Sequence, residues 1–148
     1  MRIMGLDIGQ KRIGVAVTDE QCTIAYPLEV LENTIGVKEK LYSLIKKHCI
    51  GKIVVGMPYN LKGQEGHQAK IVREFVNLNL EESGTAVDYM DERYTSRISD
   101  SVLRAGKKQE NKRGAMARNN RAGGEVDKIS ASIILSSYIE KQKQDSPK

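Results

Sequence analysis

The sequence predicts an α/β fold, in which a mixed five-stranded sheet of three antiparallel and two parallel strands carries helices on both faces. Three strand-like segments come first and are joined by short polar connections, which is typical of antiparallel pairing. Strand-like and helical segments then alternate, as in parallel α/β units. The 148 residues suit one domain with its own core, so we expect a single domain over 1–148, with a frayed tail at about 142–148.

The first three strands are expected close together. Ile3–Ile8 and Arg12–Thr18 are apolar runs joined by a turn at Gly9–Lys11. A third strand is expected over Cys22–Leu31, after the polar turn Asp19–Gln21. These three segments predict a β-meander.

A helix is expected to follow from about Thr34, which is a plausible N-cap residue. Its apolar residues recur at helical spacing, and they are Val37, Leu41, Leu44 and Ile45. The pattern predicts a helix with one buried face.

The middle of the chain predicts a buried strand and a second helix. Lys52–Gly56 is a short β-branched run, which suits a strand covered on both faces. A loop rich in glycine and proline follows at Met57–Gly66, and the next helix is expected to bury Ile71, Phe75 and Leu78 on one face.

The last part of the chain predicts one more strand and two helices. The strand covers Ala86–Met90, and the helices cover about Thr95–Ala105 and Glu125–Lys141. Between the two helices, Gly106–Gly124 shows no useful periodicity.

Positive charge is concentrated in one segment of a moderately basic chain. The net charge is +5 and the pI about 9.2. Six cations and the two acids Glu110 and Glu125 give the segment Gly106–Glu125 a charge of +4. Its cations are Lys107, Lys108, Lys112, Arg113, Arg118 and Arg121. A solvated loop is one interpretation, and phosphate binding without sequence specificity is the other.

Other features of the sequence argue against a membrane-spanning, secreted or cysteine-ligated metal protein. No apolar run approaches the roughly 20 residues of a membrane span, and no signal-peptide core is evident. Cys22 and Cys49 lack metal-type spacing, which favours reduced structural thiols in a cytosolic protein. We therefore expect a soluble cytoplasmic protein.

Three carboxylates occupy positions that can converge at one edge of the predicted sheet. Asp7 ends the first strand, Glu92 follows the last strand, and Asp127 opens the final helix. Such a cluster in a basic chain favours a hard divalent cation, Mg²⁺ or Mn²⁺, and phosphodiester chemistry. The simpler interpretations are an ordinary hairpin for Asp7 and an acid stabilised by the helix dipole for Asp127.

The neighbouring acids Asp91 and Glu92 cannot both face the same side, because side chains alternate along a strand. We expect Glu92 to face the site, with Asp91 as the alternative. A salt bridge between Asp91 and Arg93 and a helix cap at Thr95 or Ser96 would explain part of the same motif.

Several polar residues close to these acids are candidates for contacts with substrate phosphates. They are Lys11, Arg12, Asn60, Lys62 and Arg93, together with Lys112, Arg113, Arg118 and Arg121 of the basic segment.

Four blocks in order resemble the YqgF (RuvX) family of bacterial RNase H-like proteins. They are Gly5–Ala16, Val54–Pro58 with Gly63, Asp91–Arg93 with Thr95, and Val126–Lys128 with Ala131. Tyr94 and Ser130 depart from the residues usual in that family. The resemblance implies an RNase H-like fold, Asp7, Glu92 and Asp127 as the acidic positions, and a nuclease of structured nucleic acid.

The resemblance further implies 5′-end processing of pre-16S ribosomal RNA or, by fold analogy, resolution of Holliday junctions. The residues do not choose between RNA and four-way DNA, nor between a monomer and a homodimer, and a pre-ribosomal particle is an expected partner of the first activity. Two other classes compete. Gly5–Gly9 also resembles the phosphate-binding hairpin of actin-like kinases and chaperone ATPases, although those need two domains. A non-catalytic ribosome-assembly factor would not need the three acids.

Overall fold

The computed structural model describes residues 1–59, 62–92 and 122–145, with side chains in the last range described for residues 129–144. Its elements in chain order are β1 (Arg2–Ile8), β2 (Arg12–Thr18), β3 (Ala25–Glu32), α1 (Val37–Lys47), β4 (Ile50–Met57), α2 (His67–Asn79), the short 3₁₀ helix η1 (Glu81–Ser83), β5 (Ala86–Asp91) and α4 (Ala122–Asp145).

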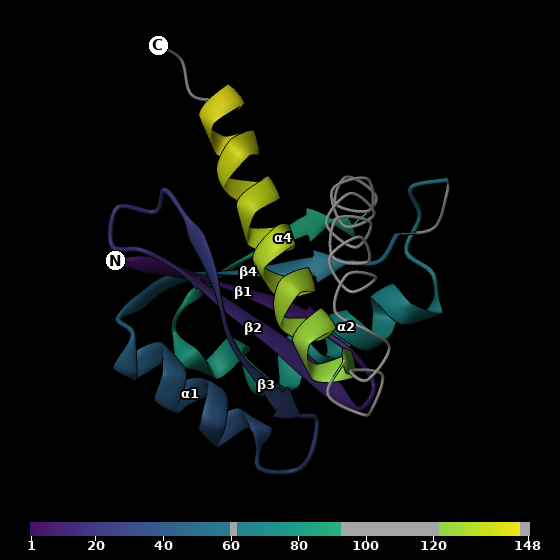
Figure 1. Ribbon diagram of the computed structural model, residues 1–148. Coiled ribbons are helices and arrows are strands. Elements are labelled where there is room, and N and C mark those ends of the chain that lie inside the picture. Colours follow the sequence, from purple (N-terminus) through teal and green to yellow (C-terminus); the bar gives the residue numbers. More distant parts are fainter. Residues whose placement is uncertain (60–61, 93–121, 146–148) are drawn as a thin grey trace, which may run out of the picture.

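The strands form one sheet in the order β3-β2-β1-β4-β5 (Figure 1). β1 pairs antiparallel with β2, and β2 antiparallel with β3. β4 pairs parallel with β1 and with β5. The predicted mixed sheet of three antiparallel and two parallel strands is therefore confirmed. β1 lies at its centre, between the antiparallel and the parallel parts.

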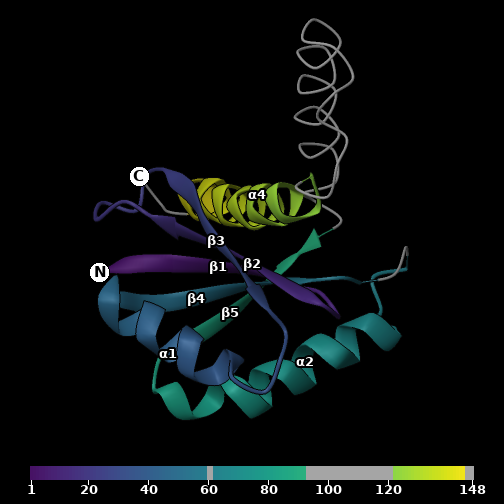
Figure 2. The ribbon, with the colours of Figure 1, turned by 60° about the horizontal axis from the view of Figure 1, so that its bottom comes forward.

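Helices cover both faces of this sheet, as predicted (Figure 2). α1 and α2 lie on one face and α4 on the other. The larger core cluster, which includes Met4, Leu6 and Ile8 of β1, contains buried residues of α1 and α2. The smaller cluster joins Ala16, Val54 and Met90 to α4. We call the second side the α4 face.

Strand β4 is buried from Ile53 to Met57, as its continuous apolar run predicted. Ile53 and Val55 belong to the larger cluster, and Val54 belongs to the smaller one. The strand is therefore covered from both sides, which requires apolar residues at successive positions.

The third strand begins at Ala25, later than predicted, because Asp19 organises the preceding turn. The Asp19 carboxylate accepts hydrogen bonds from the backbone and hydroxyl of Thr23 at 2.7 and 2.6 Å, and from the Ile24 N–H at 3.1 Å. These bonds hold the pKa of Asp19 below its usual value. Cys22 adopts a left-handed backbone with φ of 56°. Residues 19–24 therefore form a turn rather than a strand.

Two helix details differ from the prediction. Thr34 is not the N-cap of α1, because Gly36 holds that position and the Thr34 carbonyl accepts the Val37 N–H in a preceding turn. Leu78 of α2 is 66% exposed. The buried face of α2 consists of Ala69, Val72, Phe75 and Val76.

The final helix begins at Ala122, so Gly123 and Gly124 lie in its first turn. Its contact face is Ala131, Ile134, Leu135, Tyr138 and Ile139, which recur at the spacing of an amphipathic helix. The predicted helix at Thr95–Ala105 lies outside the described residues, as does most of Gly106–Gly124. In the described part of the chain, none of the helices combines the length and apolar character that a membrane crossing requires.

Candidate active site

Asp7 and Glu92 come from different strands and meet on the α4 face of the sheet. Asp7 is the penultimate residue of β1, and Glu92 is the first residue beyond β5. Their carboxyl groups are joined by a side-chain hydrogen bond. Strand β4 separates β1 from β5 in the sheet, so the Glu92 side chain reaches across β4 toward Asp7.

Gly56 of β4 provides the space for this crossing. A Cβ atom at Gly56 would lie 2.7 Å from Oε1 of Glu92 and 2.5 Å from Cδ1 of Ile134. Carbon atoms pack at about 3.5–4.0 Å, so any larger residue here would displace both side chains. The absence of a side chain at Gly56 therefore seats Glu92 between the sheet and α4.

The electrostatics of the pair follow from its position. Burial, the nearby charge of Asp7 and the hydrogen bond with Asp7 raise the pKa of Glu92 from 4.5 to about 7, and the charge of Asp91 adds to the effect. A hydrogen bond between two carboxyl groups needs a proton on one of them. At neutral pH the pair is therefore only partly ionised, and a cation placed between the two groups would favour the charged form of both.

Asp91 faces the other side of the sheet. Val87 and Tyr89 pack against the larger cluster, whereas Met90 belongs to the α4 face. Alternation therefore places Asp91 with Val87 and Tyr89, and Glu92 with Met90.

The third predicted acid, Asp127, lies in the first two turns of α4, and its side chain is outside the described residues. The backbone nevertheless shows how α4 runs along β1. Ile3 borders a cavity with Tyr138 and Ile139, and a Cβ atom at Gly5 would meet Leu135 and the Ala131 carbonyl. Moving forward along β1 thus corresponds to moving backward along α4.

This antiparallel course sets the level of residue 127. Two residues of strand advance about 7 Å, and four residues of helix advance about 6 Å. Because a Cβ atom at Gly5 would meet both Leu135 and the Ala131 carbonyl, Asp7 lies level with the segment of α4 that precedes Ala131, which includes residue 127. No group of three or more His, Cys, Asp or Glu side chains suited to a metal ion occurs among the side chains that the structure describes, which do not include Asp127.

The structure describes three of the predicted phosphate-binding residues, Lys11, Arg12 and Lys62. Lys11 and Arg12 are exposed and lie at the β1–β2 connection, next to Asp7 along the hairpin. Lys62 is exposed in the loop before α2. The other candidates fall outside the described residues: Asn60, Arg93, Lys112, Arg113, Arg118 and Arg121.

Sequence reasoning missed Asn33, which follows β3 and touches the same hairpin. Its side-chain amide donates to the Gly9 carbonyl at 2.9 Å, and its backbone N–H donates to the Lys11 carbonyl at 2.9 Å. No local pattern identifies such a residue, because its partners are more than twenty positions away in the chain.

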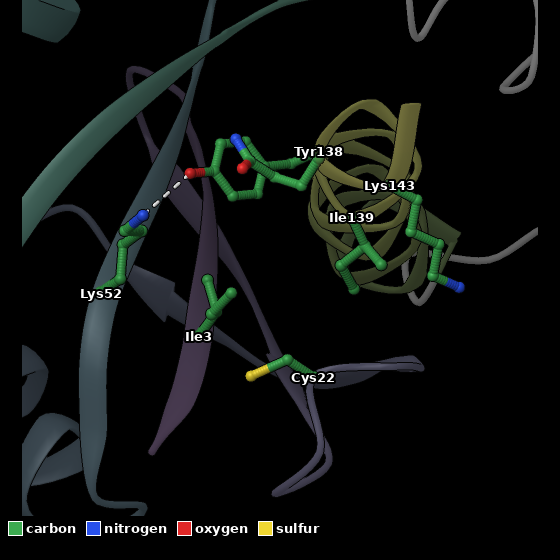
Figure 3. Close-up of a pocket in the computed structure, with 7 residues that line it drawn as sticks. Ile3, Cys22, Lys52, Tyr138, Ile139 and Lys143 are labelled. Atoms are coloured by element: carbon green, nitrogen blue, oxygen red, sulfur yellow. Dashed lines mark hydrogen bonds between the residues drawn. The ribbon is translucent and has the colours of Figure 1, made fainter. Parts of the chain in front are cut away.

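A chain of hydrogen bonds between three polar side chains holds α4 near the start of β1. Lys52 of β4 donates to the Tyr138 hydroxyl at 3.1 Å, and this hydroxyl donates to Asp88 of β5 at 2.8 Å. Figure 3 shows Lys52 and Tyr138 pointing toward one another beside a cavity of about 290 Å³, while Lys143 points away from them. Burial raises the pKa of Tyr138, so its hydroxyl stays protonated as a donor. The chain Lys52–Tyr138–Asp88 links α4 to two strands.

Known proteins resemble this chain over nearly its whole length. The family model RuvX, described as Holliday junction resolvase, matches residues 1–141. A relative from Sulfurihydrogenibium sp. is 41% identical over 95% of this chain and 90% of its own length. One from Desulforudis audaxviator is 37% identical over 97% and 96%, and one from Fusobacterium nucleatum is 38% identical over 96% and 99%. All three are named as candidate pre-16S rRNA nucleases.

Solved structures share the fold at low sequence identity. RuvC of T. thermophilus in complex with a Holliday junction substrate superposes with a TM-score of 0.60 at 13% identity, covering 97% of this chain and 96% of that one. The Fowlpox virus resolvase in complex with Holliday junction DNA gives 0.55 at 16% identity, covering 96% and 99%. These neighbours establish the RNase H-like fold predicted from the sequence.

Proposed function

Because this chain belongs to the RuvX family, we propose that it is a nuclease that hydrolyses phosphodiester bonds of structured nucleic acid, with precursor 16S rRNA as its substrate. The observation that carries the proposal is the meeting of Asp7 and Glu92 on the α4 face. Two carboxylates brought together from separate strands are costly unless a positive group or a proton joins them. Such a pair suits chemistry on a phosphate ester with a bound cation.

The donor set fits a hard divalent cation, Mg²⁺ or Mn²⁺. Carboxylate oxygens are the ligands that these ions prefer, and Gly56 leaves the Glu92 carboxylate room beside Asp7. We propose that Asp7, Glu92 and Asp127 hold the cation. When bound, it would polarise the phosphate and lower the pKa of a coordinated water.

Side chains of the protein would hold the acids in place and bind the phosphates of the substrate. Asp7 and Glu92 are anchored at the ends of β1 and β5 in one sheet, so their backbone positions are fixed before substrate arrives. Lys11 and Arg12 lie at the nearby hairpin and would bind the phosphates that flank the cleaved bond. The basic segment that contains Lys112, Arg113, Arg118 and Arg121 would extend this contact along the backbone of the nucleic acid.

The proposed substrate follows from the relatives. Those at 37 to 41% identity carry the pre-16S rRNA nuclease name, whereas the solved resolvases are only 13 to 16% identical. An enzyme that processes precursor rRNA acts where ribosomes are assembled, so we place this activity in the cytoplasm, on pre-ribosomal particles.

A four-way DNA junction is the second candidate, favoured by the description of the matching family. A resolvase cuts two strands symmetrically and would act as a homodimer, whereas an rRNA-processing enzyme can act as a monomer.

The test is cleavage by the purified protein of a precursor 16S rRNA fragment and of a synthetic four-way junction, in parallel, with Mg²⁺ or Mn²⁺. We expect cleavage of the RNA, lost in Asp7→Asn and in Glu92→Gln. Asp91→Asn is the matched control, because this neighbouring acid faces the opposite side of the sheet, and it should cleave normally. Preferred cleavage of the junction would replace the first substrate by the second, and cleavage by a folded Glu92→Gln protein would refute the site.

A further inference from the structure

The turn between β1 and β2 is held closed by a residue from a different part of the chain. The Gly9 N–H donates to the Arg12 carbonyl at 2.9 Å, which closes the turn itself. Asn33 then binds both sides of it, through Nδ2 to the Gly9 carbonyl and through its N–H to the Lys11 carbonyl. Two of these three bonds hold the backbone carbonyls of Lys11 and Arg12 themselves.

The backbone contact of Asn33 extends the sheet. Arg12 pairs with Glu32 at the end of the β2–β3 ladder, and the bond from Asn33 to Lys11 adds one more rung. From this rung, the Asn33 side chain reaches Gly9 at the end of β1. A residue of the β3–α1 connection therefore fixes the hairpin tip, which we define as residues 9–12.

The hairpin tip lies beside the acidic pair. Asp7 pairs with Gly14 in the β1–β2 ladder, and Gly9 is two residues further along, a distance of about 7 Å. Ile13 and Val15 point into the larger core, so alternation puts Arg12 on the α4 face with Asp7. The tip thus presents Arg12 on the side of the sheet where the acids meet, with the exposed Lys11 next to it in the turn.

The hydrogen bond of Asn33 is not explained by packing. Its Nδ2 contact is solvent-exposed, and Gly9, Gln10, Lys11 and Arg12 are all exposed. A turn without buried side chains would otherwise sample several conformations. Ordering it in advance reduces the entropy lost when a ligand binds to its side chains.

We propose that Asn33 is a positioning residue of the nucleic-acid site: it holds the hairpin tip so that Lys11 and Arg12 are presented to phosphates beside Asp7. The inference rests on the proposed function, because it assumes that a nucleic acid binds at these acids. Asn33 itself would touch neither the phosphate nor the cation, and it would act only through the two basic residues.

The experiment compares Asn33→Ala with Asn79→Ala. Asn79 provides a matched control, since its side-chain amide also donates to a backbone carbonyl, that of Phe75 at 3.0 Å, but at the end of α2. Binding of a fluorescein-labelled stem-loop RNA and of a labelled four-way DNA junction is measured in EDTA, where metal-dependent cleavage is blocked, over a range of salt concentrations.

We expect Asn33→Ala to weaken binding about fivefold, the factor that matches the loss of one hydrogen bond, while Asn79→Ala binds like wild type. The salt dependence should also flatten in Asn33→Ala, because poorly placed cations neutralise fewer phosphates. In cleavage assays with metal, KM should rise and kcat should stay the same.

A double-mutant cycle tests how Asn33 acts. If it acts through the hairpin cations, Asn33→Ala should cause no further loss in a protein that already carries Lys11→Ala and Arg12→Ala. An undiminished effect in that background would overturn the inference, as would equal binding by the Asn33 and Asn79 variants. A wild-type protein that binds neither probe would overturn the proposed function as well, which separates the two failures.

Discussion

Glu92→Gln should stabilise the metal-free protein at alkaline pH, although it removes a residue of the candidate active site. The wild-type carboxylate must ionise while partly buried beside Asp7, which costs free energy in the folded state only. Glutamine has nearly the same shape and carries no charge. The substitution therefore removes the repulsion and keeps the packing over Gly56.

The size of the effect follows from the pKa of Glu92. It is raised to about 7 from the ordinary 4.5, and one pH unit corresponds to about 1.36 kcal/mol, so the full effect is roughly 3 kcal/mol. Between pH 4.5 and 7 the folded state binds more protons than the unfolded state. The wild-type free energy of unfolding should therefore fall as pH rises through this window and stay low above it.

The assay is urea unfolding in EDTA at pH 4, 6 and 8, with Glu74→Gln on the exposed surface of α2 as the control. At pH 8 the Glu92→Gln protein should exceed wild type by roughly 3 kcal/mol, or about 6–10 °C in Tm for a chain of this size. At pH 4 the difference should vanish, and the control should match wild type throughout. A Glu92→Gln protein no more stable than wild type at pH 8 would refute the description of the pair.

Four further predictions concern packing and metal. Gly56→Ala should cost little stability but reduce cleavage at least about tenfold, because the added methyl group pushes the Glu92 carboxylate aside. Gly5→Ala should lower the free energy of unfolding by about 1–3 kcal/mol, since the new Cβ would lie 2.9 Å from the Leu135 Cβ. Gly36→Ala is the control in thermal melting, because a Cβ at Gly36 has no atom within 4 Å. Tyr138→Phe should lower Tm by about 2–4 °C, because Lys52 and Asp88 lose their shared partner. Millimolar Mg²⁺ should raise Tm in wild type and less in Asp127→Asn; equal shifts in the two proteins would remove Asp127 from the metal site.

The architecture was predictable because local patterns set it. Short polar turns predicted the β-meander, and a continuous apolar run predicted that β4 is buried on both faces. Alternation along β5 also predicted that only one of Asp91 and Glu92 lies on the same face as Asp7, but it did not choose between them; in the structure that residue is Glu92. Each inference used only neighbours within a few residues.

The errors arose where a side chain contacts a distant or unexpected partner. Thr34 has the chemistry of an N-cap, yet α1 starts after Gly36 because the intervening residues form a turn. Asn33 could not be singled out from the sequence, since its hydrogen bond requires Gly9, which is distant in the chain and close only in the folded structure. Leu78 fits helical spacing but lies outside the face that α2 presents to the sheet.

The small residues on the α4 face let α4 and the Glu92 side chain approach the strands at the edge where the candidate site lies. Gly5 lets the Leu135 side chain and the Ala131 backbone approach β1, while Gly56 accommodates both Ile134 and Glu92. A larger residue at Gly5 would meet the Leu135 Cβ and the Ala131 carbonyl, so it would push this part of α4 outward while Tyr138 holds the far end of the helix. The first turns of α4 would then move away from Asp7. Gly5 thus sets the distance between the sheet and α4, and Gly56 leaves room for the Glu92 side chain, so both requirements are of packing rather than of backbone conformation.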